Sequence, residues 1–163
     1  MDAKQAHRAT MDMSLFVLKS YLGDLSDAEL MTRPGPGCNH LAWQLGHLIS
    51  AEVGLLKDIS SQPPAELPAG FTEQHGKDKT GENDPTKFLT KQQYLDLFDQ
   101  VRVKTVAALE SMSDADFAKP SPERFRKFFP TVGDMMVLIA THPMMHAGQF
   151  AVTRRVLGKP VVI

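Results

Sequence analysis

The sequence predicts an all-α protein, a four-helix bundle of up-down topology with a long crossing loop between its second and third helices. Four long stretches repeat apolar residues at spacings of three, four and seven, which is the period of an amphipathic helix. No alternation of apolar and polar residues extends far enough for a useful strand. The chain of 163 residues is 42% hydrophobic, which suits a single domain with its own core over residues 1–163.

The first two expected helices are separated by a sharp break. Residues 4–22 form the first one, with a broad apolar stripe made of Ala6, Met11, Leu15, Phe16, Leu18, Tyr21 and Leu22. Residues 26–29 match a capping box before a short helical turn, and the Pro and Gly residues at 34–37 then interrupt the chain. Asn39 is a favourable N-cap, so the second helix is expected to run from there to about Lys57.

The third and fourth expected helices follow a long connection. Residues 60–85 are rich in Pro, Gly, Lys, Asp and Glu, which indicates a loop that crosses the bundle or covers one end. A capping box at residues 90–93 opens the third helix, which continues to about Met112, and a brief capped turn follows at residues 113–117. Thr131 opens the fourth helix, which ends near Gly158.

Two histidines, His142 and His146, stand four residues apart in the fourth expected helix. This spacing brings their Cβ atoms to roughly 5–6 Å of each other, so both imidazoles can bind one divalent ion. They lie within an apolar stripe made of Val132, Met135, Met136, Ile139, Phe150 and Leu157. We therefore expect them to face the bundle interior. Pro143 between them either kinks the helix or begins a new one, and in the second case His142 becomes a cap residue.

The second expected helix carries a further candidate ligand, His47. Its leucines cluster on one side, and His47 lies roughly 120° around the helix from the first of them. One face is expected to line a metal pocket, and the leucine face is expected to pack in the core or against a second subunit. The remaining expectations are His40 as a reserve ligand, Glu52 pointing outward, and His7 and His75 on the surface.

Two segments carry a family resemblance. The first spans residues 39–56 and contains W-x-x-G-H-L at 43–48, and the second spans residues 131–160 and contains H-x-x-x-H-x-G-Q followed by R-x-x-L-G-K-P. These segments resemble the second and last helices of the DinB/YfiT-like superfamily of four-helix-bundle metalloproteins. The likeness extends loosely over the whole chain, and Pro143 departs from the family pattern.

The resemblance implies a metal centre and a class of reaction. It places three metal ligands at His47, His142 and His146, and it implies zinc or nickel. Three imidazoles leave one position of a tetrahedral zinc open, where water, a thiolate or a substrate oxygen can bind. Several DinB-like relatives resemble transferases or isomerases that use a low-molecular-weight thiol such as mycothiol or bacillithiol. A thiol-linked transferase with a small-molecule substrate is therefore expected, with Gln149 as a candidate for orienting the bound group.

Two other function classes stay open. A metal-dependent hydrolase would use the same site with water, and a non-catalytic metal-binding or ligand-binding bundle would use it for stability or binding alone. A homodimer is expected, because the leucine face could pack against a second copy and dimers are common among the relatives that the sequence resembles. No Glu stands three residues before a His, so the E-x-x-H pattern of di-iron bundles is absent, and no H-E-x-x-H marks a zinc protease.

Charge and composition exclude other classes of partner. The net charge of -1 and a pI near 6.6 provide no basic surface for nucleic acid. The start of the chain has no apolar segment of signal-peptide length, and no stretch approaches the ~18 apolar residues of a membrane span. Cys38 is the only cysteine and permits no intrachain disulfide, so a reducing, cytoplasmic location is expected.

Overall fold

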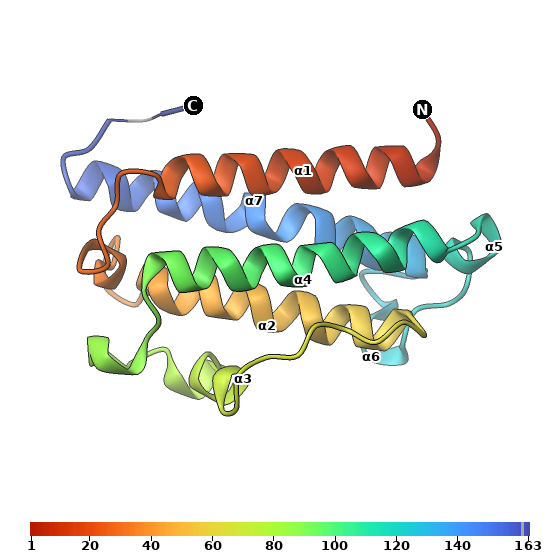
Figure 1. The fold of residues 1–163 in the computed structure, drawn as a ribbon, viewed down its shortest axis with the longest axis horizontal. Helices are drawn as coiled ribbons and strands as arrows, with labels where there is room; N and C mark the ends of the chain where they lie inside the picture. The colour runs from red at the N-terminus through yellow and green to blue at the C-terminus, as the bar shows by residue number, and fades with distance from the viewer. Residues whose placement is uncertain (161) are drawn as a thin grey trace.

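Four long helices pack side by side in the computed structural model, which describes residues 1–160 and 162–163. They are α1 (Ala3–Leu22), α2 (Leu41–Ile59), α4 (Lys91–Ser111) and α7 (Val132–Val156) (Figure 1). Between these described residues the only β pairing is an isolated bridge from Pro120 to Thr131. The prediction of an all-α four-helix bundle is confirmed.

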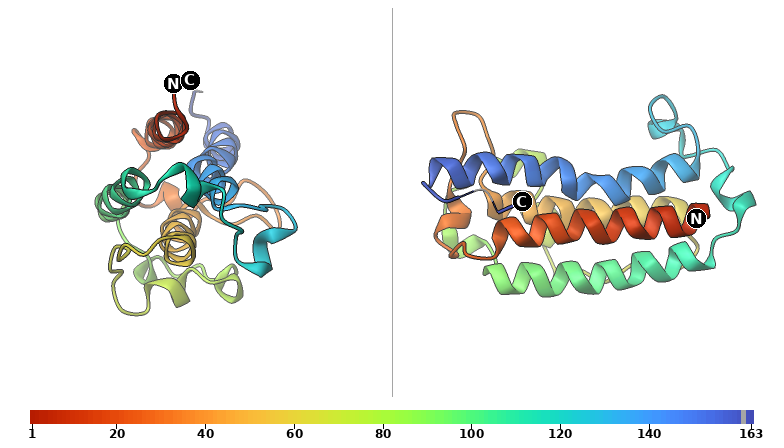
Figure 2. Two further views of the ribbon diagram at one scale, coloured as in Figure 1. Left: turned by 90° about the vertical axis from the view of Figure 1, so that its right-hand side faces the viewer. Right: turned by 90° about the horizontal axis from the view of Figure 1, so that it is seen from above.

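The crossing segment, residues 60–90, returns the chain along the length of the bundle. It contains the short helix α3 (Phe71–Gln74) and the 3₁₀ turns η2 (Lys77–Lys79) and η3 (Pro85–Lys87), where only a loop was expected. Because of this return, α2 and α4 point in the same direction, and α1 and α7 point the opposite way (Figure 1). The end-on view in Figure 2 shows that the crossing segment lies outside α2. It therefore covers one side of the helix that carries His47.

Reciprocal side-chain caps start the helices where the sequence predicts them. Thr90 caps α4 with Gln93, and Thr131 caps α7 with Asp134. Capping bonds also link residues 26 and 29 before the turn η1 (Glu29–Met31), and Ser113 caps α5 (Asp114–Phe117). A further short helix, α6 (Glu123–Arg126), lies in the connection to α7. These caps satisfy backbone N–H groups that a helix terminus leaves without partners.

The cap of α2 differs from the prediction. Its N-cap is His40, whose Nδ1 accepts a hydrogen bond from the Trp43 N–H at 3.1 Å. Asn39 instead offers its carbonyl oxygen to the side chain of Gln44 at 2.8 Å. The expected Asn39 cap is therefore wrong, because an imidazole nitrogen one residue later supplies the acceptor.

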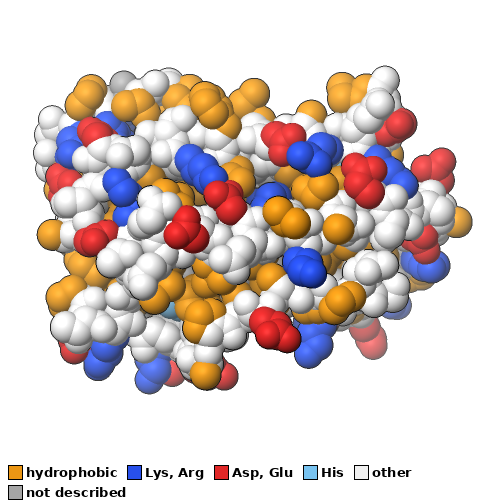
Figure 3. Space-filling model, in the orientation of Figure 1, with side chains coloured by type: hydrophobic (Ala, Val, Ile, Leu, Met, Phe, Trp, Pro, Cys, Tyr) orange, Lys and Arg blue, Asp and Glu red, His pale blue; other side chains and the backbone are white. Residues whose placement is uncertain are grey.

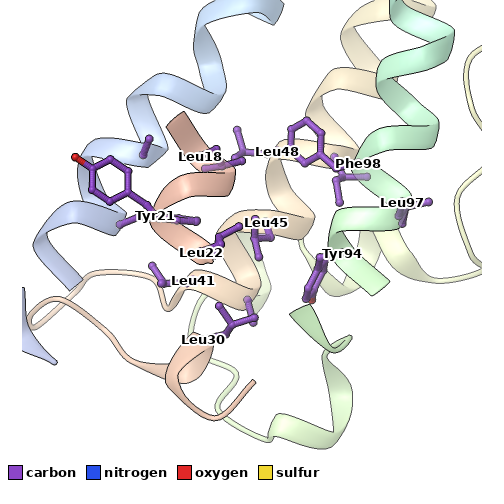
Figure 4. Packing of buried hydrophobic residues seen from close by; sticks show 14 of the residues in the cluster. Leu18, Tyr21, Leu22, Leu30, Leu41, Leu45, Leu48, Tyr94, Leu97 and Phe98 are labelled. Carbon is purple, nitrogen blue, oxygen red and sulfur yellow. The ribbon is translucent and has the colours of Figure 1, made fainter. Parts of the chain in front are cut away.

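The leucine face of α2 lies inside this chain's own core. Figure 4 shows Leu41, Leu45 and Leu48 among side chains from α1 and α4. Leu55 belongs to a second cluster, in which α7 supplies Met135, and it too is buried. The expectation that this face packs in the core is confirmed, and the alternative of a second subunit on it is wrong.

Glu52 was expected to point outward, but it lies on the same buried side of α2. Its Oε2 pairs with Nη2 of Arg102 at 3.0 Å, and its Oε1 accepts a hydrogen bond from the Thr105 hydroxyl at 2.7 Å. Both charged side chains are buried, and burial raises the pKa of Glu52. Each of these buried charges would be costly without a partner, so the pair favours the packing of α2 against α4.

Pro143 does not break α7, which continues from Val132 to Val156 as one helix. The proline is buried, and without an N–H it leaves the carbonyl of Ile139 without its helical donor. His142 is therefore a residue of the helix interior rather than a cap. The i, i+4 relation of His142 and His146 is preserved, and the alternative of a helix starting at Pro143 is wrong.

Some apolar side chains remain on the outside of the bundle. Figure 3 shows hydrophobic side chains along the edge that α1 forms. Met13 and Phe16 of α1 are among the exposed hydrophobic residues. Ala6 and Phe16 thus fall outside the buried part of the stripe predicted for the first helix, while Met11 and Leu18 are buried. Every helix within residues 1–160 and 162–163 is either too short or too polar to span a bilayer.

Candidate metal centre

Three histidines meet between α2 and α7. His47 comes from α2, and His142 and His146 come from successive turns of α7. One ligand atom of each ring lies within 4.8 Å of the ligand atoms of the other two. In the described part of the chain, no fourth His, Cys, Asp or Glu joins this group. The structure thus brings together the three residues that the sequence singled out, in an arrangement that could hold a metal ion.

The surroundings of the cluster keep its imidazoles neutral. Burial, followed by the repulsion of the neighbouring imidazoles, lowers the pKa of His146 to about 3. Burial and the nearby His47 lower the pKa of His142 to about 4. Burial also lowers the pKa of His47, and the positive charge of Lys77 in the crossing segment adds to that effect. Only a neutral imidazole offers a lone pair to a metal, so all three rings are in the ligating form at neutral pH.

Gln44 fixes the orientation of one ring. Its Oε1 lies 2.8 Å from Nδ1 of His146, and its Nε2 donates to the Asn39 carbonyl. Because an amide oxygen only accepts, Nδ1 of His146 carries the proton and Nε2 keeps its lone pair. Gln44 is fully buried and was missed from the sequence. A signal was present, since a buried amide in an apolar stretch of helix must find partners.

The crossing segment supports His47 from the outside. The ring of Trp43 stacks on His47 with centroids 5.0 Å apart and an interplanar angle of 6°. The indole Nε1 donates to the carbonyl of Gly76 at 3.2 Å, so the crossing segment holds Trp43 in place. Trp43, which is buried, therefore forms one wall of the cluster.

His75 is not a surface residue as expected, because it inserts against α2. It is 4% exposed, its Nδ1 bonds to the Phe71 carbonyl at 2.7 Å, and its Nε2 bonds to the Tyr94 hydroxyl at 2.8 Å. A Cβ at Gly46 would stand 2.1 Å from the ring, so only glycine fits beside it. The sequence could not single out this contact, because α2 also carries Gly54, whose Cβ would meet no atom within 4 Å. This contact fixes the crossing segment next to His47.

Two other sequence candidates do not join the cluster. Both ring nitrogens of His40 are engaged, one by the Trp43 N–H and the other by the Glu82 carbonyl at 3.0 Å, so its expected role as reserve ligand is wrong. Gln149 is exposed on α7, and its backbone carbonyl accepts the Thr153 hydroxyl. The hydrogen bond that orients a cluster ring comes from Gln44 instead.

The donor set fits a divalent metal. Neutral imidazoles suit several divalent metals, including zinc, copper, iron and nickel, and a ligating histidine usually donates its other ring N–H to an acceptor, as His146 does to Gln44. Two nitrogens bound to one tetrahedral zinc lie about 3.4 Å apart. The ligand atoms here lie within 4.8 Å of one another, so the rings would have to move closer together to bind one tetrahedral ion.

The family of the chain follows from its sequence profile. The profile of the DinB superfamily matches residues 14–150. The chain belongs to the DinB superfamily. The match covers α2 entirely and most of α7, so all three histidines of this DinB chain lie within it.

A solved structure has the same fold as this DinB protein. A conserved protein from Enterococcus faecalis superposes with a TM-score of 0.67, and the match covers 98% of this chain and 99% of that one. The two sequences are 16% identical, so the likeness concerns the fold alone. No curated protein matches this DinB sequence significantly.

Proposed function

We propose that this protein is a divalent-metal-dependent transferase that acts on a small molecule with a low-molecular-weight thiol. His47, His142 and His146 would hold zinc or nickel. One observation carries the proposal: three neutral imidazoles converge, and Gln44 presents the His146 ring as a metal ligand. When bound there, the ion would supply Lewis-acid activation of a thiol or of water.

The chain's own residues have separate roles in this proposal. Gln44 holds the proton on Nδ1 of His146, and Trp43 shields one side of His47 from water. The positive charge of Lys77 acts on His47 from the crossing segment, and it favours an anionic group such as a thiolate near the cluster. With three histidines in the cluster, a tetrahedral ion keeps one position for an outside group. Closed structural sites instead use four protein ligands.

The first experiment is elemental analysis of chelator-treated protein after reconstitution with zinc or nickel. The wild type should bind one ion per chain, and His142→Ala together with His146→Ala should abolish binding. His7→Ala, a half-buried histidine outside the cluster, is the matched control and should bind like the wild type. Absence of metal in the reconstituted wild type would overturn the proposal.

A second experiment separates catalysis from binding. The metal-loaded protein is screened for conjugation of a thiol to an electrophile, and for hydrolysis, beside His146→Ala. Metal-dependent thiol conjugation supports the transferase, and hydrolysis without thiol supports the metal-dependent hydrolase. If His146→Ala loses the metal and lowers stability with no change in turnover, the site serves a non-catalytic bundle.

The oligomeric state and location are also proposals. We expect a homodimer, which must use a surface other than the buried leucine face of α2. Sedimentation equilibrium at micromolar concentration measures the mass directly, and the mass of one chain would contradict the dimer. The single Cys38 agrees with a reducing cytoplasm, and no nucleic acid or membrane partner is proposed.

A further inference from the structure

A cavity of about 390 Å³ adjoins the histidine cluster. We call it the α2–α6–α7 pocket, and its lining consists of Ala51, Gly54, Leu55, Asp58, Arg124, Phe125, Leu138 and His142. Ala51 follows His47 by one turn of α2, and Leu138 precedes His142 by one turn of α7. The pocket therefore continues from the cluster toward α6, and His142 belongs to both.

Gly54 makes room in this pocket. It is an exposed residue in the interior of α2, where glycine destabilises a helix relative to alanine. A Cβ at Gly54 would meet no atom within 4 Å, so packing does not require glycine at this position. Gly46 is the opposite case, because His75 occupies the space of its Cβ. The small size of Gly54 thus leaves space empty where a ligand can lie.

The lining of the pocket selects the kind of group that fits. Ala51, Leu55, Phe125 and Leu138 offer only apolar side chains, which would remove water from a polar ligand without replacing its hydrogen bonds. The charges at the rim already satisfy each other, since Arg124 pairs with Asp58 and its guanidinium lies 4.8 Å from the centre of the Phe125 ring. A polar, charged thiol is poorly suited to such walls. An alkyl or aryl group is well suited to them.

We propose that the α2–α6–α7 pocket binds the apolar body of the second substrate, an alkyl or aryl compound whose reacting end lies at His142. The inference rests on the proposed function, because it assigns one of two substrates to a side of the metal centre. The pocket should also bind an apolar group when no metal is present, so its binding can be tested on the metal-free chain.

The test on the metal-loaded protein uses a series of alkyl hydroxamates from acetohydroxamate to hexanohydroxamate, measured by calorimetry. The hydroxamate group binds the metal, and the alkyl chain should enter the pocket. Each added CH₂ should tighten binding by about fourfold until the pocket is full, which corresponds to about 0.8 kcal/mol per buried CH₂. Gly54→Leu should fill the pocket, so affinity should no longer depend on chain length, while acetohydroxamate binding should stay unchanged.

Gly148→Leu is the matched control. Gly148 is an exposed glycine in the interior of α7 whose Cβ would also meet no atom within 4 Å, and it does not line the pocket. This variant should keep the wild-type dependence on chain length. Affinity that is independent of chain length in the wild type, or that rises equally in Gly54→Leu, would overturn the inference.

A second measurement keeps the inference separate from the proposed function. Methyl-labelled, metal-free protein is titrated with 1-hexanol and followed by NMR. Shifts at the methyl groups of Leu55 and Leu138 that disappear in Gly54→Leu support the pocket even if no metal binds. Shifts confined to other regions, or their persistence in Gly54→Leu, would overturn the inference while leaving metal binding untouched.

Discussion

Gln44 and Gln149 provide a matched pair of substitutions around His146. Gln44 is fully buried, and its Oε1 accepts a hydrogen bond from Nδ1–H of His146 at 2.8 Å, whereas Gln149 is exposed three residues beyond His146. Replacement of either by methionine preserves the length of the side chain and removes its amide. Gln44→Met should weaken zinc binding, and Gln149→Met should have little effect.

The size of the effect follows from the hydrogen bond that is lost. When Nε2 of His146 binds a metal, the ring cannot change tautomer, so in Gln44→Met its half-buried Nδ1–H is left without its acceptor. Such an unsatisfied donor costs about 1–3 kcal/mol. Loss of an outer hydrogen bond of this kind typically lowers metal affinity about 10–100-fold, or about 1.4–2.7 kcal/mol, which agrees with that range. We expect less than about twofold for Gln149→Met, because no interaction of its side chain is lost.

The assay is competition between the protein and a chromophoric zinc chelator at pH 7, with circular dichroism to confirm folding. The lost hydrogen bond from Gln44 to the Asn39 carbonyl affects the protein with and without metal equally, so it cancels in the affinity. Equal affinities for the wild type and Gln44→Met, or a larger loss in Gln149→Met, would refute the assigned role of Gln44.

Three further predictions concern stability and are measured by denaturant unfolding. Gly46→Ala should destabilise the fold by about 1–3 kcal/mol, because the new Cβ overlaps the buried ring of His75. Gly54→Ala should stabilise the fold by up to about 1 kcal/mol, because its Cβ meets no atom and alanine favours a helix. The reverse order would contradict the contact between Gly46 and His75. Arg102→Met should lower the free energy of unfolding by about 3–5 kcal/mol, because it leaves the buried Glu52 without its charged partner. This loss should be smaller at acid pH, where the Glu52 carboxyl is protonated. A loss that does not depend on pH would contradict the ion pair. Burial lowers the pKa of His40 to about 4, so only the unfolded chain protonates this residue as pH falls from about 6.5. Its own contribution to the decrease in the free energy of unfolding down to pH 4 should be about 3 kcal/mol, beside those of His142 and His146, whose pKa values are also lowered. His40→Asn keeps a capping acceptor, and the free energy of unfolding of this variant should fall less steeply between pH 6.5 and pH 4. An unchanged slope would contradict the lowered pKa of His40.

The fold could be predicted from the sequence, because the signals that indicate helices and their ends are local. Helical periodicity and reciprocal caps at Thr90 and Thr131 depend on residues within one or two turns, and the structure places those helix starts as predicted. The i, i+4 pair on α7 is equally local. Pro143 left two alternatives, and the packing of the whole helix, which buries the proline, decided between them.

The parts that were missed depend on contacts between distant segments. His75 becomes buried because the crossing segment folds back onto Gly46, and Gln44 reaches a histidine 102 residues away. Glu52 is buried against α4, where Arg102 and Thr105 supply its partners. A polar side chain gives no indication from sequence alone of which remote partner will satisfy it, so these residues were assigned to the surface or overlooked.

X-ray absorption spectroscopy of the zinc-reconstituted protein counts the ligands of the ion and distinguishes imidazole from sulfur. We expect three imidazole nitrogens at about 2.0–2.1 Å and one further light-atom ligand from outside the chain. The His142→Ala and His146→Ala double variant should show no such imidazole shell. A spectrum without imidazole scattering, or one with sulfur from Cys38 as a ligand, would contradict the three-histidine centre.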